Sequence, residues 1–209
     1  MFDFLALITN KKYWKFHSLI ISLILRIYGI KVGKNFYIEG TPKLKIRGKA
    51  ENIEIGDNVS IFGSIDFRNR ENGKIKICEG VSIDNDCRFI AANNAALTIG
   101  KRTGIGPFSI FNCGVSVTIG EDCLFAGHIY VQSSEHGIAR GAIIREQGHT
   151  YSEISIGNDC WIAANAMLAK GSVLGDGCIV GAKSFVRNAT FEENSIIAGT
   201  PAKKIGERK

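Results

Sequence analysis

Residues 156–186 read IGNDCWIAANAMLAKGSVLGDGCIVGAKSFV, and an aliphatic side chain returns at every sixth position of this stretch. The positions that share this period are Ile156, Ile162, Leu168, Leu174, Val180 and Val186. A period of six matches neither a 3.6-residue helix nor a hairpin meander. It is typical of a solenoid in which each hexapeptide forms one short strand and one corner, so that three of them, about eighteen residues, make a triangular coil.

The same period recurs upstream, in the series Ile55–Ile61–Phe67, Ile77–Ile83–Phe89, Ile99–Ile105–Phe111–Val117 and Ile119–Phe125–Val131. These anchors are expected to point inward. Four residues after an anchor stands a small or β-branched residue, which we expect at the tight corner between strands. The residues at this corner position are Val59, Ile65, Val81, Cys87, Thr103, Ser109, Val115, Cys123, Cys160, Ala166, Ser172, Cys178, Ser184 and Thr190. The sequence therefore predicts an all-β solenoid over residues 33–190.

Four of the six cysteines fall at this corner position, where a buried thiol acts as a small hydrophobic group. The other two, Cys78 and Cys113, lie outside it and are candidates for exposure. The sequence has no CxxC or CxxH spacing of the kind that binds zinc, and no signal peptide. We therefore predict structural cysteines, no metal site and a cytoplasmic location.

The predicted organisation has three parts: an N-terminal helical segment over 1–32, the solenoid over 33–190, and a C-terminal tail over 191–209. Residues 10–30 (NKKYWKFHSLIISLILRIYGI) are expected to be helical. Their densest apolar run, 19–25, is too short to cross a bilayer, which takes roughly 20 residues. The helix could cap the open first coil. It could also lie on an anionic membrane surface at the inner face, through Lys11, Lys12, Trp14 and Lys15.

Residues 138–153 (IARGAIIREQGHTYSE) have no hexapeptide phase. They predict a long loop, 137–153, that interrupts the coils. Loops of this length in a compact repeat protein are usually functional, so the chemistry is expected here.

Three segments resemble the left-handed β-helix acyltransferases. Residues 156–166 are similar to that family's IG-x-x-x-WIG segment, residues 180–186 to its IGAGSVV segment, and residues 198–205 to its AGNPAKVI ending. The chain departs from the pattern at Ala163 and Ala164, where glycine or serine is common, and at Arg187–Asn188, where Thr-Lys is common. The most similar group within the family is the sugar O-acetyltransferases, some of which modify bacterial surface polysaccharides. The resemblance implies a left-handed parallel β-helix and acetyl transfer from acetyl-CoA.

Acyl transfer to a hydroxyl needs a base, and an unperturbed imidazole, with a pKa of about 6.5, suits that role. Of the four histidines, His17 lies in the predicted helix and His128 is expected to point outward from a coil. In the resembling family the catalytic histidine follows an acidic residue upstream of the WIG segment, and Glu135–His136 matches that pattern. The resemblance thus implies His136 as general base, with Glu135 and His149 beside the acceptor. Because neighbouring strand residues face opposite sides, Glu135 need not orient His136.

The resemblance also implies that acetyl-CoA lies along the outside of the coils, in a groove between two subunits of a homotrimer. Small residues would let its pantetheine arm approach the backbone at Ala163, Ala164, Gly181 and Ala182. Positive charge near the adenosine phosphates would come from Lys183, Arg187, Lys203 and Lys204. Trp161 would border the reacting end of the groove, or pack against the loop.

The net charge of +6 suits an anionic cofactor, membrane or substrate equally well, and no nucleic-acid motif accompanies it. Two rival functions use the same scaffold: a sugar N-acetyltransferase, and a non-catalytic solenoid, against which the loop and its histidine argue. A metal-dependent hydratase would need histidines five apart on one coil, whereas His128 and His136 are eight apart. The expected acceptor is a surface polysaccharide or its precursor.

Overall fold

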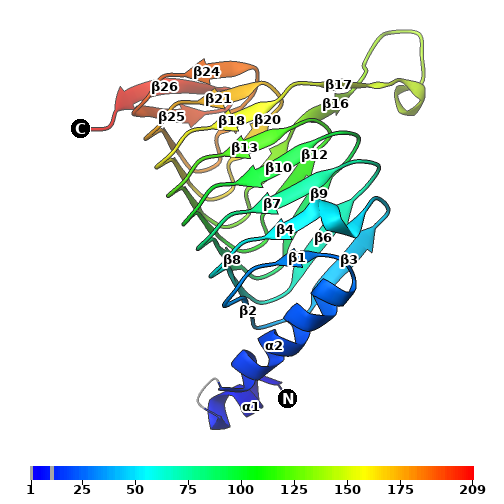
Figure 1. The fold of residues 1–209 in the computed structure, drawn as a ribbon. Helices are drawn as coiled ribbons and strands as arrows, with labels where there is room; N and C mark the ends of the chain where they lie inside the picture. The colour runs from blue at the N-terminus through cyan, green and yellow to red at the C-terminus, as the bar shows by residue number, and fades with distance from the viewer. Residues whose placement is uncertain (1, 10–11) are drawn as a thin grey trace.

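Three parallel sheets form the faces of the coil in the computed structural model, which describes residues 2–9 and 12–209 (Figure 1). Sheet A contains β1 (Lys31–Val32), β4 (Ile53–Ile55), β7 (Lys74–Ile77), β10 (Ala96–Ile99), β13 (Val117–Ile119), β18 (Ile154–Ile156), β21 (Ser172–Leu174) and β24 (Ala189–Phe191). Sheet B contains β2 (Tyr37–Ile38), β5 (Ser60–Phe62), β8 (Ser82–Asp84), β11 (Gly104–Ile105), β14 (Leu124–Phe125), β19 (Trp161–Ile162), β22 (Ile179–Val180), β25 (Ser195–Gly199) and β26 (Ala202–Glu207). Sheet C contains β3 (Pro42–Ile46), β6 (Ile65–Asn69), β9 (Cys87–Ala91), β12 (Ile110–Cys113), β15 (Tyr130–Gln132), β20 (Met167–Ala169) and β23 (Phe185–Val186).

The six-residue anchors form the core. Each is buried, and anchors of successive coils pair in register, as Ile119 does with Ile156 and Ile156 with Leu174. Along sheet C the aromatic anchors stack edge to face, with ring centroids 5.9 Å apart for Phe67–Phe89 and 5.2 Å for Phe89–Phe111. The predicted fold, a left-handed parallel β-helix of hexapeptide repeats, is confirmed.

The corner position is buried as predicted at all but two places. Val115 is only partly buried and Thr190 is exposed. Thr190 lies opposite Val173, whose side chain is also exposed, while Ala189 takes the place opposite the buried Ser172. The chain therefore turns into β24 one residue earlier than the strict period predicts.

Cys113 corrects a second expectation. It is fully buried, because β12 is four residues long and continues past the anchor Phe111. Residues two apart on a strand share a face, so Cys113 points inward beside its anchor. The four corner cysteines are buried as expected.

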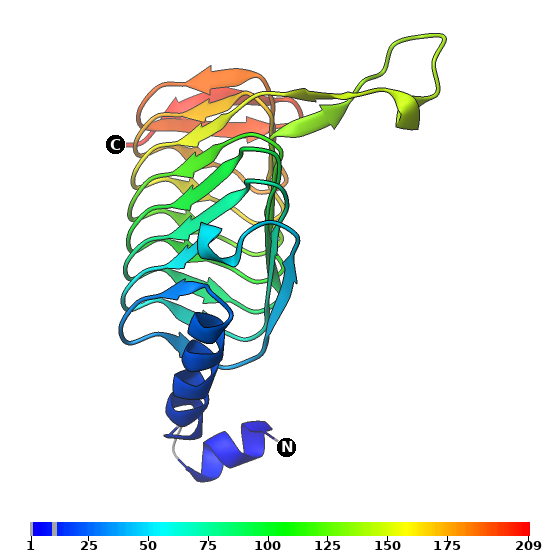
Figure 2. The ribbon, with the colours of Figure 1, turned by 45° about the vertical axis from the view of Figure 1, so that its right-hand side comes forward.

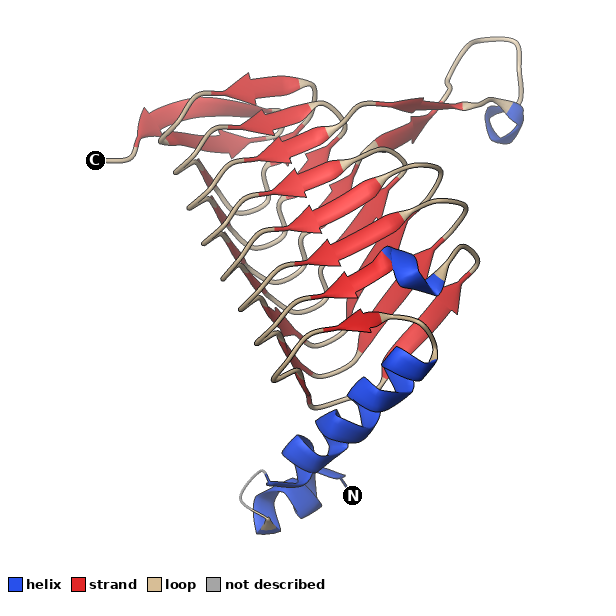
Figure 3. Ribbon diagram, in the orientation of Figure 1, coloured by secondary structure: helices blue, strands red, loops and turns tan. Residues whose placement is uncertain are grey.

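Two helices precede the coils, α1 (Phe2–Ile8) and α2 (Lys12–Ile27), and they lie at the end of the solenoid opposite the C-terminus (Figures 1 and 3). The sequence predicted one helix over 10–30 and missed α1. The face that α2 packs on the first coil is buried at Trp14, Ser18, Ile21, Ser22 and Leu25. The Ser18 hydroxyl accepts a hydrogen bond of 2.8 Å from the Ile38 amide of β2, so α2 caps the coil.

Trp14 does not make the predicted membrane contact, because the side chain of Trp14 is buried where α2 packs on the first coil. Lys12 and Lys15 are exposed, whereas Lys11 lies outside the described residues. Within the ranges 2–9 and 12–209, no helix is long and apolar enough to cross a membrane.

The C-terminal region continues the solenoid beyond the predicted boundary at residue 190. β25 adds a parallel strand to β22, and β26 folds back antiparallel on β25. The first strand, β1, begins at Lys31, two residues before the predicted start. An antiparallel strand at the end of a parallel stack covers the open edge that would otherwise pair with another chain.

The predicted loop is an arm that projects from the corner between sheets C and A, near the C-terminal end of the stack (Figure 2). Its base is the antiparallel pair β16 (Ser134–His136) and β17 (His149–Tyr151), and a single 3-10 turn, Ile144–Glu146, lies in its outer part. The Gln147 side chain ties the outer part together by hydrogen bonds to the Ala139 amide, at 2.7 Å, and to the Ala142 carbonyl, at 3.0 Å.

Candidate functional site

His136 stands at the foot of the arm, directly opposite His149 in the β16–β17 ladder. The two ring centroids are 4.1 Å apart and both side chains are exposed. The antiparallel register of the arm thus brings together the predicted general base, His136, and His149, which was predicted beside the acceptor. Two solvent-accessible imidazoles in contact can accept and donate protons at the surface of a rigid coil.

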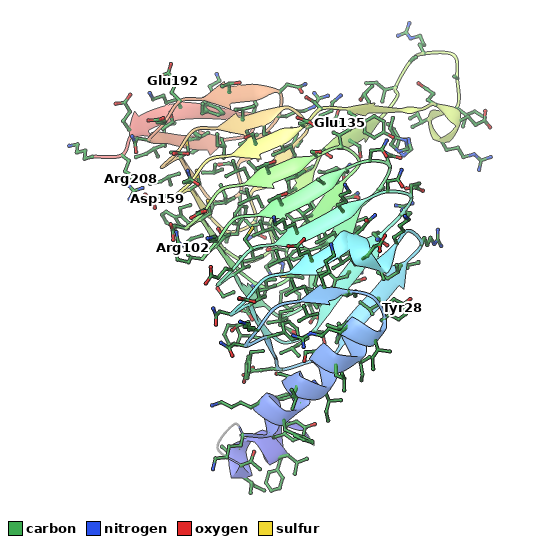
Figure 4. The ribbon with its side chains drawn as sticks, in the orientation of Figure 1. Tyr28, Arg102, Glu135, Asp159, Glu192 and Arg208 are labelled. Carbon is green, nitrogen blue, oxygen red and sulfur yellow. The ribbon has the colours of Figure 1, made fainter. Side chains whose placement is uncertain are left out.

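Glu135 points to the other side of β16, as strand alternation predicts. Its carboxylate accepts hydrogen bonds from Arg187 Nε at 2.6 Å and Nη2 at 2.5 Å, and Lys170 Nζ lies 3.5 Å away. Figure 4 labels Glu135 where the arm leaves the coils. We call Glu135, Lys170 and Arg187 the arm clamp, since they join the base of the arm to the two coils that follow it.

The charges of the arm clamp stabilise one another. The hydrogen bonds from Arg187 lower the pKa of Glu135, and although partial burial opposes this shift, the charges of Arg187 and Lys170 add to it. The side chain of Lys170 is only 13% exposed, and its ammonium group also donates to Thr150 Oγ1 at 2.6 Å. Both strands of the arm are therefore bound to one half-buried cation. Sequence reasoning missed Lys170, which carries no signal apart from its position after β20.

Arg187 was predicted to lie near the cofactor phosphates, and Glu135 was predicted to contact the acceptor. In the structure the guanidinium group of Arg187 binds the carboxylate of Glu135. In this arrangement the two groups position the arm, and their predicted contacts with the cofactor phosphates and the acceptor stay predictions.

Tyr151 packs against the backbone of the coil beside the histidine pair. A Cβ atom at Gly114 would lie 2.7 Å from the Tyr151 ring, so only glycine leaves room for it there. The ring centroid of Tyr151 is 6.0 Å from that of His149. Tyr151 therefore holds β17 down on the coil.

A chain of polar side chains leads along sheet C to the arm. The Tyr130 hydroxyl donates to Gln132 Oε1, and Gln132 Nε2 donates to the Ser134 carbonyl at 2.8 Å. Asn112 Nδ2 approaches Gln132 Oε1 at 3.5 Å. These half-buried groups face outward beside His136 and can hydrogen-bond a hydroxylated ligand.

The predicted cofactor residues gather at the corner between sheets B and C. The Ala163 amide donates to the Val180 carbonyl, and the Gly181 amide to the Ile197 carbonyl, so successive coils stack small residues there. The small residues of this column are Gly106, Ala126, Ala163, Gly181 and Ala198. At Gly181 a Cβ atom would come within 3.2 Å of the Ala198 Cβ.

Ala164, Ala182 and Lys183 lie beside this column, since the Lys183 amide donates to the Ala164 carbonyl at 3.0 Å. Lys203 joins them from β26, opposite Ala198. All the predicted cofactor residues except Arg187 therefore share one corner. A smooth backbone surface with cations at its end fits a pantetheine arm and its phosphates.

Trp161 lies at a third place, the corner between sheets A and B, and is 49% exposed. It borders a hollow of about 230 Å³ together with Leu124, Ile179 and the ion pair of Arg208 with Asp159. The arm leaves the coil from the opposite end of sheet A. Trp161 and His136 therefore do not meet within one protomer.

Two of the buried cysteines are held in the thiol form by their surroundings. Burial raises the pKa of Cys87 to about 11 and also raises the pKa of Cys113. Among the described residues, no group of three His, Cys, Asp or Glu side chains is arranged to hold a metal ion.

The family described as bacterial transferase hexapeptide (six repeats) matches residues 153–188. The chain is 27% identical to the galactoside O-acetyltransferase of Escherichia coli (strain K12), over 85% of this chain and 87% of that protein. It is 30% identical to "Probable acetyltransferase Rv3034c" of Mycobacterium tuberculosis over 59% of this chain, and spans 41% of that protein's length.

Two solved structures share the fold. The polySia specific acetyltransferase NeuO superposes with a TM-score of 0.62 at 22% identity, covering 85% of this chain and 78% of that one. A variant of AntD, an N-acyltransferase from Bacillus cereus in complex with dTDP and coenzyme A, superposes with a TM-score of 0.61 at 19% identity. That match covers 89% of this chain and 88% of AntD.

Proposed function

We propose that this chain, which belongs to the hexapeptide-repeat (left-handed β-helix) acyltransferase family, moves an acetyl group from acetyl-CoA to a sugar hydroxyl. The acceptor is a surface polysaccharide or its precursor. The observation that carries the proposal is the exposed His136, fixed at the foot of an arm that is clamped to rigid coils. The galactoside O-acetyltransferase and NeuO, which share the repeat or the fold, support an acetyl donor and a sugar acceptor.

His136 acts as the general base. Its imidazole takes the proton of the acceptor hydroxyl while that oxygen forms a bond to the thioester carbonyl carbon, and the imidazolium returns the proton to the thiolate as the C–S bond breaks. A thiol of ordinary pKa, about 8.5, leaves readily once its sulfur is protonated. Backbone amides near the thioester stabilise the oxyanion.

The groups around His136 position it. His149 packs on the imidazole ring from the opposite strand, and the arm clamp fixes the strand that carries His136. The polar chain Tyr130–Gln132–Asn112 offers hydrogen bonds to the hydroxyls of a sugar. A base held in one orientation by its neighbours contributes more to the rate than one that must find its orientation at each turnover.

Acetyl-CoA binds along the column of small residues between sheets B and C. Ala163, Ala164, Gly181 and Ala182 contact its pantetheine arm, and Lys183 and Lys203 contact its phosphates. Because Trp161 and His136 lie at different corners of one coil, the complete site takes residues from two protomers of a homotrimer.

The outer face of α2 is the second surface of interest. Its large apolar side chains lie away from the coil and are 43–78% exposed; they are Phe16, Leu19, Ile20, Leu23, Ile24 and Ile27. Lys12 and Lys15 are exposed on the same helix. An amphipathic helix of this kind binds the interface of an anionic bilayer, so the enzyme acts at the cytoplasmic face of the membrane. Trp14, which is buried, takes no part in this contact.

A sugar N-acyltransferase is the second candidate, because AntD has the same fold with a nucleotide and coenzyme A bound. The linkage of the product distinguishes the two. The purified protein is incubated with radiolabelled acetyl-CoA and a panel of polysaccharides and nucleotide sugars. The proposal expects label in the acceptor that mild alkali releases as acetate, whereas alkali-stable label would identify an amide and contradict it.

A further inference from the structure

Cationic side chains gather on the outer face of sheet C in the first three coils. Alternate residues of β3 and β6 point outward, and the register places Lys43, Asp66 and Arg88 in one row and Lys45, Arg68 and Ile90 in the next. Arg47 and Arg70 follow directly after these strands. We call the six cations the basic patch: Lys43, Lys45, Arg47, Arg68, Arg70 and Arg88.

One buried carboxylate orients two of these cations. Asp66 accepts hydrogen bonds from Arg68 Nε and Nη2, at 2.9 and 2.6 Å, and from Arg88 Nε at 2.9 Å. Although burial by itself raises the pKa of Asp66, the hydrogen bonds and charges of Arg68 and Arg88 lower it below its ordinary value. Asp66 therefore stays ionised and fixes both guanidinium groups.

The remaining cations of the basic patch have no such partner. Of the carboxylates in the described ranges, none lies within 4.0 Å of Lys45, Arg47 or Arg70. Together with Arg68 and Ile90 these three border a hollow of about 140 Å³. Lys45 lies directly opposite Arg68 in the strand register, and like charges so placed destabilise a sheet.

Other arginines of the solenoid are paired differently. Arg102, for example, binds both Glu121 and Asp122, at 2.9 and 2.6 Å. Unlike Arg102, the three cations Lys45, Arg47 and Arg70 share one hollow with no described carboxylate in an ion pair with them. Bound anionic groups would relieve the repulsion among these cations, and guanidinium groups hold carboxylates and phosphates by paired hydrogen bonds.

The basic patch lies on sheet C, and the histidine pair lies on the separate two-stranded sheet of the arm, which leaves the coils where β15 of sheet C ends. When the strand register is continued past the strand ends, Arg70 lies opposite Ala92, Ala92 opposite Gly114, and Gly114 opposite Ser134. Ser134 is two residues before His136. Coils are spaced by about 4.8 Å, so Arg70 and Ser134 are roughly 14 Å apart. Ala92 is small, whereas the Tyr151 ring covers the backbone at Gly114, so the surface that leads from the basic patch ends at Tyr151 beside the histidine pair.

We propose that the basic patch binds anionic groups of the acceptor while another part of the same molecule reaches His136. This inference rests on the proposed acetyl transfer and narrows its acceptor to an extended, negatively charged saccharide. The anionic groups are either the carboxylates of an acidic glycan or the phosphates of a diphosphate-linked precursor. Both groups have negatively charged oxygen atoms, which can accept hydrogen bonds from Arg47, Arg68 and Arg70.

The test compares Arg47→Gln/Arg70→Gln with a matched control, Lys74→Gln/Lys76→Gln. The control removes the same charge from exposed positions of β7, on sheet A. The probes are hexagalacturonic acid, the neutral maltohexaose and inorganic pyrophosphate, each titrated calorimetrically at low and at moderate salt. Acetyl-CoA is titrated into the same preparations.

The wild type and the control are expected to bind hexagalacturonic acid, pyrophosphate or both, more weakly at higher salt, and to bind maltohexaose far more weakly. The Arg47→Gln/Arg70→Gln variant loses at least about tenfold in affinity for the anion, since each lost charge-assisted hydrogen bond costs that much, and retains acetyl-CoA binding. Binding of hexagalacturonic acid alone assigns the patch to glycan carboxylates, and binding of pyrophosphate alone assigns it to a diphosphate.

The inference is overturned if neither anion binds, if maltohexaose binds equally well, or if the two double variants behave alike. Failure of the proposed function gives a different result, the absence of acetyl-CoA binding in the wild type.

Discussion

The arm clamp allows a quantitative prediction about how the base is positioned. Glu135→Gln keeps the shape of the side chain and removes its charge, so the paired hydrogen bonds from Arg187 weaken and Lys170 loses its counter-ion. A partly exposed ion pair contributes up to about 1 kcal/mol. A poorly exposed ammonium group left without its partner costs about 1 kcal/mol more. We therefore expect the attachment of the arm to weaken by about 1–2 kcal/mol.

Hydrogen exchange followed by mass spectrometry measures that loss. Amides of β16 and β17 are expected to exchange about 5–30-fold faster in Glu135→Gln, since each 1.4 kcal/mol corresponds to a factor of ten. The kcat value should also fall, by at most that factor, because His136 spends less time in place, while the KM for acetyl-CoA is unchanged. Glu153→Gln removes one carboxylate just beyond the arm and serves as the control.

The pH dependence follows from the lowered pKa of Glu135. A carboxylate whose pKa is depressed in the folded state contributes stability that is present above its unfolded pKa and is lost as the pH falls through the folded value. The protection of the wild-type arm, taken relative to the intrinsic exchange rate at each pH, should therefore fall specifically in acid, and Glu135→Gln should not show this fall. Unchanged exchange and unchanged kcat in Glu135→Gln would refute the idea that the clamp positions His136.

Three further predictions concern the core, the assembly and the helix. Cys160→Ala is expected to cost about 1–3 kcal/mol in thermal or chemical unfolding and to leave kcat intact, because the thiol only fills a corner; an inactive but folded variant would contradict this. Sedimentation should show a trimer, and inactive His136→Ala and Trp161→Ala subunits should regain activity when mixed, which a self-sufficient protomer would not do. Leu19→Glu/Leu23→Glu should abolish flotation with anionic vesicles, as the control Phe62→Glu should not; equal flotation of the two would exclude the α2 face.

The solenoid could be predicted because its signal is local and repeated. Each anchor is buried by the same residues of the next coil, so one period in the sequence determines the whole stack. The prediction failed where the period is broken, as at Cys113, because a longer strand adds a second inward residue. Trp14 was misassigned because the open end of the first coil buries it, and no local pattern encodes that contact.

The site was less accessible to sequence reasoning. The position of His136 followed from a resemblance, but its contact with His149 depends on the antiparallel register of the arm. The bond between Glu135 and Arg187 joins residues 52 apart and requires the stacking of coils. The alternating cations at Lys43, Lys45 and Arg47 are visible in the sequence, yet only the strand register places Lys43 opposite Asp66 and Lys45 opposite Arg68.

The most direct measurement is the steady-state kinetics of His136→Ala beside His149→Ala. We expect His136→Ala to lower kcat by roughly 10²–10⁴-fold, the contribution of a general base, while acetyl-CoA binding survives. The kcat/KM of the wild type should fall in acid as the base takes up a proton, and His149→Ala should mainly raise the acceptor KM. If His149→Ala is inactive and His136→Ala keeps most of its turnover, the base is His149 and the central claim is wrong.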